Sequence, residues 1–318
     1  MRWVAALLAA VAAVVPLSGC GDDGAEPGAP QGATLVLDFT PNAVHSGIYA
    51  ALAHDWYRRA GVDLEVRQPG ASTDAPKLLA AGRADFAILD IHDLGIARER
   101  GIDIVGVMPI VQRPLASVIA RGDRGIRGPR DLEGRTVGVT GLPSDDAVVD
   151  SEVEADGGDP SAVKRVTIGF NAVASLAAGK VDAATGFWNA EAVALRREGT
   201  PIRVFKVDDY GAPRYPELVL CTSNKAMKEN PGLVRAVVGA TTHGYRFTVD
   251  HPDEALDDLV EAVPSLDRAE QAAQMRVLLP ALAPAPFDFP VLRSWERWDR
   301  KHGVLEERLP VHRTFVNG

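Results

Sequence analysis

The sequence predicts an α/β protein of two similar lobes, with helices alone in its last part. Three observations support this fold class. Short apolar runs alternate with segments of helical period, which indicates doubly wound, mostly parallel sheets. A helix–glycine–aspartate–strand pattern occurs twice along the chain. Beyond residue 225 only helical periods follow.

The predicted elements follow from the apolar runs and their period. The predicted strands are 34–39, 64–67, 86–89, 104–110, 116–120, 136–139, 164–167, 183–186, 203–206 and 218–222. The predicted helices include 47–60, 75–81, 173–178, 225–259 and 265–279.

The repeated pattern predicts that the two lobes share one construction. Residues 77–87 read KLLAAGRADFA, and residues 176–184 read LAAGKVDAA. In both, a glycine is expected to end a helix in the left-handed conformation, and an aspartate opens the next strand. An ordinary helix–strand turn can have the same appearance, so that alternative stays open.

Two apolar segments, 115–122 and 217–224, are predicted to connect the lobes. We expect lobe one to comprise residues 34–118 and 219–318, and lobe two to comprise residues 119–218. Two thin connections form a hinge, and hinged lobes can close around a ligand.

The start of the chain predicts export and lipid attachment. Arg2 precedes an apolar run at 3–17 and then LSGC, the layout of a secretory signal. That run is short for a spanning helix, which needs about 20 residues. LSGC resembles the bacterial lipobox, in which the cysteine, here Cys20, carries the lipid; an ordinary signal peptide is the alternative. We expect residues 1–19 to be the signal peptide, and the Gly-, Pro- and acid-rich residues 20–33 to be a flexible tether on the outer face of the cell membrane.

Composition excludes several function classes. The formal net charge is −9 and no basic run appears, which argues against a nucleic-acid partner. The chain has 2 cysteines, so Cys221 is the only thiol expected in the folded part, and no internal disulfide can form there. No nucleophile elbow, HExxH motif or paired-cysteine metal site occurs. We therefore expect no catalytic residues, no metal and no cofactor.

The first predicted strand leads into a candidate ligand site. Ligands of open α/β sheets lie beyond the carboxyl ends of the strands, which here points to Asp38, Phe39 and Asn42. His45 and Tyr49 are four residues apart, on one face of the following helix. The alternatives are that Asn42 caps this helix and that the other two side chains only pack.

Two further strand ends supply polar candidates. Asp90 follows the strand at 86–89 and can meet a ligand amine or cap the next helix. Residues 138–147 read GVTGLPSDDA, where Thr140, Gly141, Pro143 and Ser144 form a turn that exposes backbone amides. The two aspartates of this turn would repel a phosphate, so a neutral polar ligand is favoured. Capping by the serine is the alternative.

The segment 185–191, TGFWNAE, combines aromatic and polar candidates in Phe187, Trp188, Asn189 and Glu191. An indole face can stack on a heteroaromatic ring, which contributes about 0.5–1.5 kcal/mol beyond burial. A carboxylate can accept from an amine on such a ring and pair with a ring nitrogen. Tyr215 is a candidate for the same aromatic wall. Core packing of the tryptophan and a surface position of the tyrosine are the alternatives.

The segments LDFTPNAVHSGIYAA, GVTGLPSDDA and TGFWNAEAVAL together resemble the NMT1/THI5-like periplasmic substrate-binding proteins. This group includes transporter components that capture thiamine-pyrimidine precursors. The resemblance covers about residues 34–300. It implies a type II periplasmic binding protein fold, with two α/β lobes joined by two crossing strands and C-terminal helices that return to lobe one. It also implies a monomer that delivers its ligand to an ABC transporter permease. In the pyrimidine binders, the heterocycle lies between aromatic rings and a carboxylate meets its ring nitrogens.

The resulting prediction is a lipid-anchored solute receptor for a small heteroaromatic ligand, an aminopyrimidine thiamine precursor. A receptor for riboflavin or a flavin-like heterocycle is one alternative. A receptor for an alkyl sulfonate such as taurine is another, although its cleft should be basic or hydroxyl-rich. Pyrimidine synthases of this fold group use a cysteine-rich motif, which is absent here. A sensor that signals to a membrane partner remains a further hypothesis.

Overall fold

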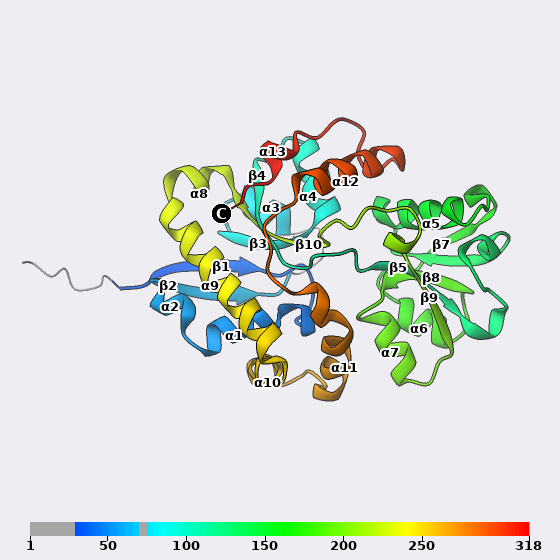
Figure 1. Cartoon of the computed structure of the whole chain (residues 1–318), viewed down its shortest axis with the longest axis horizontal. Coiled ribbons are helices and arrows are strands. Elements are labelled where there is room, and N and C mark those ends of the chain that lie inside the picture. The colour runs from blue at the N-terminus through cyan, green and yellow to red at the C-terminus, as the bar shows by residue number, and fades with distance from the viewer. Residues whose placement is uncertain (1–28, 70–74, 318) are drawn as a thin grey trace, which may run out of the picture.

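A computed structural model describes residues 29–69 and 75–317, which form two lobes arranged along the long axis of the molecule (Figure 1). The predicted signal peptide, the proposed lipidation site Cys20 and most of the predicted tether lie outside the described residues.

The sheet of lobe one has five strands in the order β2-β1-β3-β10-β4. Its strands are β1 (Gln31–Val36), β2 (Val62–Arg67), β3 (Phe86–Asp90), β4 (Ile104–Pro109) and β10 (Leu218–Ser223). β1 pairs in parallel with β2 and β3, whereas β10 runs antiparallel to β3 and β4.

The sheet of lobe two repeats this arrangement in the order β7-β6-β8-β5-β9. Its strands are β5 (Ala116–Arg121), β6 (Thr136–Val139), β7 (Lys164–Thr167), β8 (Ala183–Phe187) and β9 (Ile202–Lys206). β6 pairs in parallel with β7 and β8, and β5 runs antiparallel to β8 and β9. All ten predicted strands are confirmed. The prediction of mostly parallel sheets is half right, because in each sheet the strand that arrives from the other lobe is antiparallel to both neighbours.

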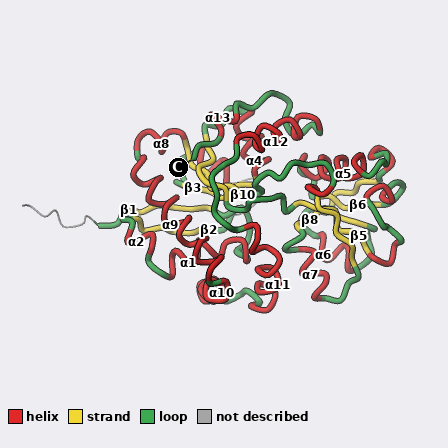
Figure 2. The backbone as a smooth tube through the Cα atoms, in the orientation of Figure 1, coloured by secondary structure: helices red, strands yellow, loops and turns green. Residues whose placement is uncertain are grey.

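Helices flank both sheets, and the last third of the chain is helical, as predicted (Figure 2). They are α1 (Ser46–Ala53), α2 (Trp56–Arg59), α3 (Ala75–Ala80), α4 (Ile91–Glu99), α5 (Pro143–Ala155), α6 (Ala172–Ala177), α7 (Glu191–Arg197), α8 (Asn224–Glu229), α9 (Pro231–Asp250), α10 (Pro252–Ala262), α11 (Arg268–Leu278), α12 (Phe289–Lys301) and α13 (Val311–Thr314).

Two predicted helices are divided in the structure. The helix expected at 47–60 is broken between α1 and α2 at Asp55, which has a left-handed φ of 58°. The helix expected at 225–259 becomes α8, α9 and α10. Pro231 and Pro252 each stand at the first position of a new helix, where a missing backbone N–H costs nothing.

The first strand begins earlier than predicted and also ends earlier. β1 starts at Gln31, inside the segment expected to be a tether, and pairs residue by residue with β2 from Val62 onward. Backbone hydrogen bonds to a neighbouring strand need no apolar side chain, so composition alone could not detect this start. The strand ends at Val36, and the following residues turn toward the lobe junction.

The repeated pattern has the same structural role in both lobes. Gly82 and Gly179 adopt left-handed φ values of 63° and 66°. The Asp85 carboxylate accepts a hydrogen bond from the Thr34 amide of β1 at 2.8 Å. The Asp182 carboxylate accepts one from the Thr136 amide of β6 at 3.0 Å. The two aspartates therefore join equivalent strands, which favours a shared construction over a chance resemblance of turns.

Lobe one carries an additional helical layer, in which α9 packs on α1. A Cβ added to Gly244 of α9 would lie 1.9 Å from the backbone oxygen of Gly47 in α1. The two helices thus touch backbone to backbone, a separation that only glycine permits.

The lobes are joined by two extended segments and by α12, which reaches from lobe one toward lobe two (Figure 1). Because β5 begins at Ala116, the chain enters the second sheet before the boundary expected after residue 118. The Trp298 indole of α12 donates to the Ser151 hydroxyl of α5 at 3.1 Å. Lys301 pairs with Glu154 of the same helix α5 at 2.8 Å.

Candidate ligand-binding site

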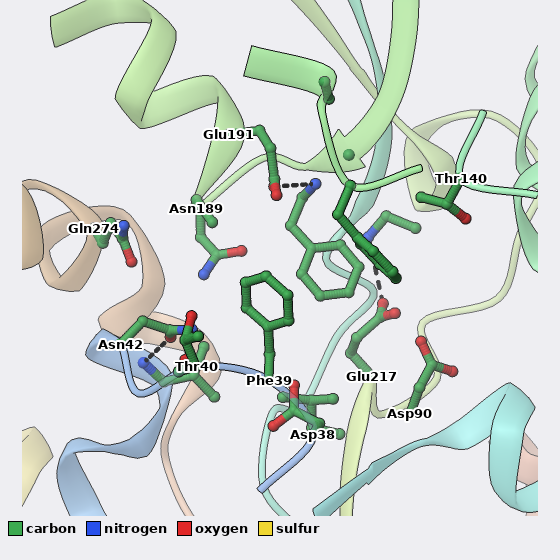
Figure 3. A pocket seen from close by; sticks show the side chains of 18 of the residues that line it. Asp38, Phe39, Thr40, Asn42, Asp90, Thr140, Asn189, Glu191, Glu217 and Gln274 are labelled. Carbon is green, nitrogen blue, oxygen red and sulfur yellow. Dashed lines mark hydrogen bonds between the residues drawn. The ribbon is translucent and has the colours of Figure 1, made fainter. Parts of the chain in front are cut away.

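A cavity of about 530 Å³ lies between the lobes, and Figure 3 shows it from close by. Lobe one contributes the residues after β1, the end of β3, the start of α4 and one face of α11. Lobe two contributes the turns after β6, β7 and β8. The carboxyl ends of strands therefore face the cavity from both sides, as expected for an open α/β sheet.

The cavity wall is acidic. Eight carboxyl side chains line it: Asp38, Asp90, Asp93, Asp145, Glu191, Glu217, Asp267 and Glu270. None of the described residues that line the cavity is lysine or arginine. His92 also lines it, but one ring nitrogen contacts the Asp299 carboxylate at 2.9 Å and the other contacts the Tyr215 hydroxyl at 3.1 Å. Both ring nitrogens of this imidazole therefore already have hydrogen-bond partners within the protein.

Two of the acids form a buried pair at the lobe junction. The charge of Glu217 contributes to the raised pKa of Asp90, so the two carboxyl groups interact. Asp90 also accepts from the His92 amide at 2.7 Å, and Glu217 accepts from the Leu115 amide at 2.5 Å. Burial raises the pKa of Glu217 to about 7 and raises the pKa of Asp90 well above its usual range. Glu217 is therefore about half protonated near pH 7, so this pair of acids can both donate and accept.

Other wall acids also have raised pKa values, in each case mainly because burial disfavours the charged form. The pKa of Asp93 is raised to about 6, and the pKa values of Glu191 and Asp145 are also raised. Glu191 accepts from the Phe187 amide at 2.8 Å, which holds its carboxyl at the cavity edge of α7.

Three phenylalanines supply the aromatic surface of the cavity: Phe39, Phe170 and Phe187. The rings of Phe39 in lobe one and Phe170 in lobe two lie 5.9 Å apart at 42°. Their exposed fractions are 41% and 58%, which is unusual for large apolar side chains. Their contact joins the two lobes beside the cavity.

Trp188 does not line the cavity, so its position does not support the expected role as a stacking surface. The side chain is 4% exposed, and its indole N–H donates to the Pro114 carbonyl at 2.8 Å. Lys206 Nζ lies 4.0 Å from the ring centroid. Successive side chains at a strand end point to opposite faces. Phe187 therefore faces the cavity while the next residue packs against the crossing segment.

His45 and Tyr49 are also absent from the cavity wall. His45 is fully buried, and its Nδ1 accepts from the Asn42 amide at 3.1 Å. Its Nε2 then carries the proton and donates to the Asp38 carboxylate at 2.8 Å, so this histidine orients a wall acid. Tyr49 lines a separate hollow with Asp258 and neighbouring residues of α1 and α10.

Tyr215, Gly141 and Pro143 likewise lie outside the wall. Tyr215 is fully buried behind His92. Gly141 has a φ of 99° and Pro143 begins α5, so both shape the turn between Thr140 and Ser144, which do line the cavity.

Two predicted residues, Asn42 and Asp90, lie in the cavity wall and also cap a helix. Asn42 lines the cavity, and its side chain also accepts from the Val44 amide at 2.9 Å as a helix cap. Asp90 lines the cavity and caps α4. Ser144 makes no cap, because Leu142 occupies the cap position of α5.

Sequence reasoning missed several wall residues. Phe170 follows the end of β7, and the strand-end rule applied to that strand would have found it. Glu217 stands in a crossing segment that was interpreted only as a connection. Gln271 and Gln274 come from α11, far along the chain, and no local pattern marks them.

Two solved structures show the fold class. The alkanesulfonate-binding protein SsuA from Xanthomonas axonopodis pv. citri bound to MOPS superposes with a TM-score of 0.74, at 16% identity, over 91% of this chain and 99% of that chain. The aliphatic sulphonate binding protein SsuA from Escherichia coli gives 0.76, at 13% identity, over 91% and 93%. The chain therefore has the periplasmic binding protein fold.

Residues 42–255 match the family described as NMT1/THI5 like, and the chain belongs to that family. The formylaminopyrimidine-binding protein of Halalkalibacterium halodurans is 32% identical, over 88% of each chain. The riboflavin-binding protein RibY of Chloroflexus aurantiacus is 25% identical, over 90% of this chain and 85% of that protein. The 4-amino-5-hydroxymethyl-2-methylpyrimidine phosphate synthase of Legionella pneumophila is 23% identical, over 89% and 90%.

Neither a membrane-spanning helix nor a cluster of metal ligands occurs in the described residues. Within 29–69 and 75–317, no helix has both the length and the apolar character needed to span a bilayer. In the same ranges, no group of three or more His, Cys, Asp or Glu side chains is arranged to hold a metal ion.

Proposed function

We propose that this protein is an extracytoplasmic solute receptor that captures an aminopyrimidine thiamine precursor between its lobes and delivers it to an ABC transporter. The observation that carries the proposal is the cavity wall, which combines three phenylalanines with eight carboxyl groups and contains no lysine or arginine. Such a wall favours a flat ring with N–H donors. The 32% identity to a formylaminopyrimidine-binding protein supports the same ligand class.

The acid pair gives the aminopyrimidine a specific partner. An aminopyrimidine edge presents an N–H donor beside a ring-nitrogen acceptor. The pKa of Glu217 is about 7, so one oxygen of the pair can accept from the amine while an acid proton is donated to the ring nitrogen. Glu191 offers a second carboxyl group of raised pKa in the same cavity. Phe39 and Phe187 supply ring faces for stacking.

The same wall disfavours the sulfonate alternative. A sulfonate is an anion, and its burial requires positive charge or several N–H donors. The described wall offers no Lys or Arg, and the ring nitrogens of His92 are engaged by Asp299 and Tyr215. A flavin is disfavoured less strongly. Its two ring carbonyls need donors, and the carboxyl groups of the wall can donate only when they are protonated.

A synthase activity is also disfavoured, although some relatives are named as synthases. Cys221 is fully buried in β10, and its thiol contacts the Val219 carbonyl. No cysteine or lysine belongs to the described cavity wall, so the wall offers no thiol nucleophile and no amine that could hold a cofactor covalently. We therefore propose that this protein binds its ligand and does not convert it chemically.

We further propose a lipid anchor at Cys20, a permease partner and a monomeric state. The LSGC segment supports the anchor. Metabolic labelling with a radioactive fatty acid should mark the wild-type protein in bacterial cells, and Cys20→Ser should abolish the label. Labelling of the Cys20→Ser variant at the wild-type level would contradict the anchor.

The ligand proposal is tested by thermal shift with three probes. They are 4-amino-5-hydroxymethyl-2-methylpyrimidine, riboflavin and taurine. We expect only the pyrimidine to raise the melting temperature, with about 2.7 kcal/mol of added stability at a hundred times its dissociation constant. Asp90→Asn and Glu191→Gln should each reduce this ligand-induced shift.

Trp188→Phe is the matched control, because this ring packs outside the cavity. The variant should lose some intrinsic stability but keep the shift that the pyrimidine produces. Stabilisation by taurine alone would refute the proposed ligand class, and stabilisation by riboflavin alone would replace it with a flavin.

A further inference from the structure

The carboxamide of Asn189 has an unpaired, buried acceptor at the cavity wall. The residue lines the cavity between β8 and α7 and is 1% exposed. Its Oδ1 has no hydrogen-bond partner among the described residues. Figure 3 shows this carboxamide between Gln274 and Phe39. Buried polar atoms in folded proteins nearly always have a partner, so this oxygen calls for a donor from a bound molecule.

Gln274 presents a second such acceptor. It lines the cavity from α11 and is 4% exposed. Its Nε2 donates to Glu270 Oε1 at 3.2 Å, which fixes the orientation of the carboxamide. The remaining oxygen, Oε1, has no partner in the described part of the chain.

The two carboxamides come from different lobes. Asn189 lies just before α7 of lobe two, whereas Gln274 lies on α11 in the C-terminal helices. Arg197 of α7 pairs with Asp267, the cap residue of α11, at 3.2 Å. The helices α7 and α11 are therefore in contact, and Figure 3 shows the two carboxamides on the same side of Phe39.

We propose that Asn189 and Gln274 form a second polar subsite, which binds a neutral hydrogen-bond donor on a side group of the ligand. Neutral carboxamide oxygens suit an alcohol O–H or an amide N–H. The inference rests on the proposed function, in which the ring amine is bound by the acids. In the view of Figure 3, Asp90 and Glu217 lie on the other side of Phe39 from these carboxamides. The ligand is thus an aminopyrimidine with a polar substituent.

The test compares two pyrimidines that differ only at the side group, 4-amino-5-hydroxymethyl-2-methylpyrimidine and 4-amino-2,5-dimethylpyrimidine. Calorimetric titration of the wild-type protein should give about tenfold tighter binding of the hydroxymethyl compound, because the dimethyl compound leaves the buried oxygens unpaired. Gln274→Met and Asn189→Leu keep the side-chain size but remove the acceptors. Each should reduce the preference to about threefold or less.

Arg276→Met is the control, because Arg276 is exposed on the same helix α11 and does not line the cavity. It should keep the wild-type preference. Equal weakening of both pyrimidines by Gln274→Met would overturn the subsite and leave the aminopyrimidine assignment intact. Failure of both pyrimidines to bind the wild-type protein would overturn the proposed function and the subsite with it. If Asn189→Leu does not fold, the Gln274→Met result decides.

Discussion

The two lobes share a framework and differ in the chemistry that they present to the cavity. Both sheets place one antiparallel strand fourth in a five-strand order, and both use a helix-ending glycine followed by an aspartate that binds a neighbouring strand. Lobe one and the crossing segments supply the buried acid pair Asp90 and Glu217. Lobe two supplies Phe187, Asn189 and Glu191. The turns at the strand ends therefore differ between the lobes, while the strands of both sheets follow one plan.

The lobes also differ in their helical layers. In lobe one, α9 covers α1 at a glycine–glycine contact, and the C-terminal helices follow. Lobe two comprises one continuous run of chain from β5 to β9. We therefore expect lobe one to depend most on close helix packing, and the following predictions test that difference.

The largest effect is expected at the helix contact of lobe one. Gly244→Ala places a Cβ 1.9 Å from the Gly47 carbonyl oxygen, so α9 must shift away from α1. We expect a loss of about 3 kcal/mol or more in the free energy of unfolding, measured by urea denaturation.

Gly239→Ala is the matched control on the same helix, because a Cβ at Gly239 meets no atom within 4 Å. It should be neutral or stabilise the protein by up to about 1 kcal/mol, since alanine favours helices over glycine. Equal unfolding midpoints for the two variants would refute the proposed dependence on close packing.

The second effect is the pH dependence of stability that the acid pair of Asp90 and Glu217 produces. Burial raises the folded-state pKa of Glu217 from 4.5 to about 7, so the folded protein retains a proton that the unfolded chain releases between these values. The resulting stability is full below about pH 4.5 and is lost as the pH rises through about 7. This contribution to the free energy of unfolding is at most about 3 kcal/mol.

Glu217→Gln should flatten this dependence, because the amide cannot ionise yet can still accept from the Leu115 amide. Glu229→Gln, on the exposed surface of α8, should keep the wild-type slope. The measurement is the free energy of unfolding at several pH values from 4 to 8. If the free energy of unfolding of Glu217→Gln depended on pH as steeply as that of the wild type, the assignment of this proton to Glu217 would be contradicted.

A smaller effect tests the shared framework directly. Asp85→Ala and Asp182→Ala each remove the acceptor for a strand amide, and each should cost about 1 kcal/mol. Native-state hydrogen exchange should report the loss in β1 and β3 for the first variant and in β6 and β8 for the second. Faster exchange in the same lobe for both variants would show that the two aspartates are not equivalent.

The smallest effect is expected at the surface between the lobes. The pair of Arg197 and Asp267 is partly exposed, so Arg197→Gln should change the free energy of pyrimidine binding by about 0.5 kcal/mol or less. Titration at low and high salt should give a difference that shrinks as salt rises. A loss of tenfold or more in affinity would mean that this pair controls closure.

The framework was predictable from the sequence because strands and helix ends are local features. Apolar runs between turn residues indicated every strand, and the strand-end rule led to Asp38, Asp90 and Glu191. Which side chain of a turn faces the cavity is not local information. The sequence predicts a stacking face for Trp188, yet strand alternation turns this side chain away from the cavity.

Two other kinds of residue could not be predicted from the sequence: those that orient a wall residue from behind, and those that reach the cavity from a distant part of the chain. His45 has the residue type of a ligand contact, but it is buried behind Asp38 and orients that acid. Gln274 approaches the cavity only through the packing of α11 against the rest of the fold. Such a contact depends on tertiary arrangement, which the pattern of one chain segment does not encode.

The exchange of strands between the sheets has a consequence for how the chain folds as it emerges from synthesis or export. Lobe two is continuous from Ala116 to Lys206, so it can complete its sheet early. The sheet of lobe one lacks the strand between β3 and β4 until residues 218–223 arrive. During that interval both strands expose unpaired edges, which are prone to aggregation. A newly made chain is thus most vulnerable in its N-terminal part, although that part appears first.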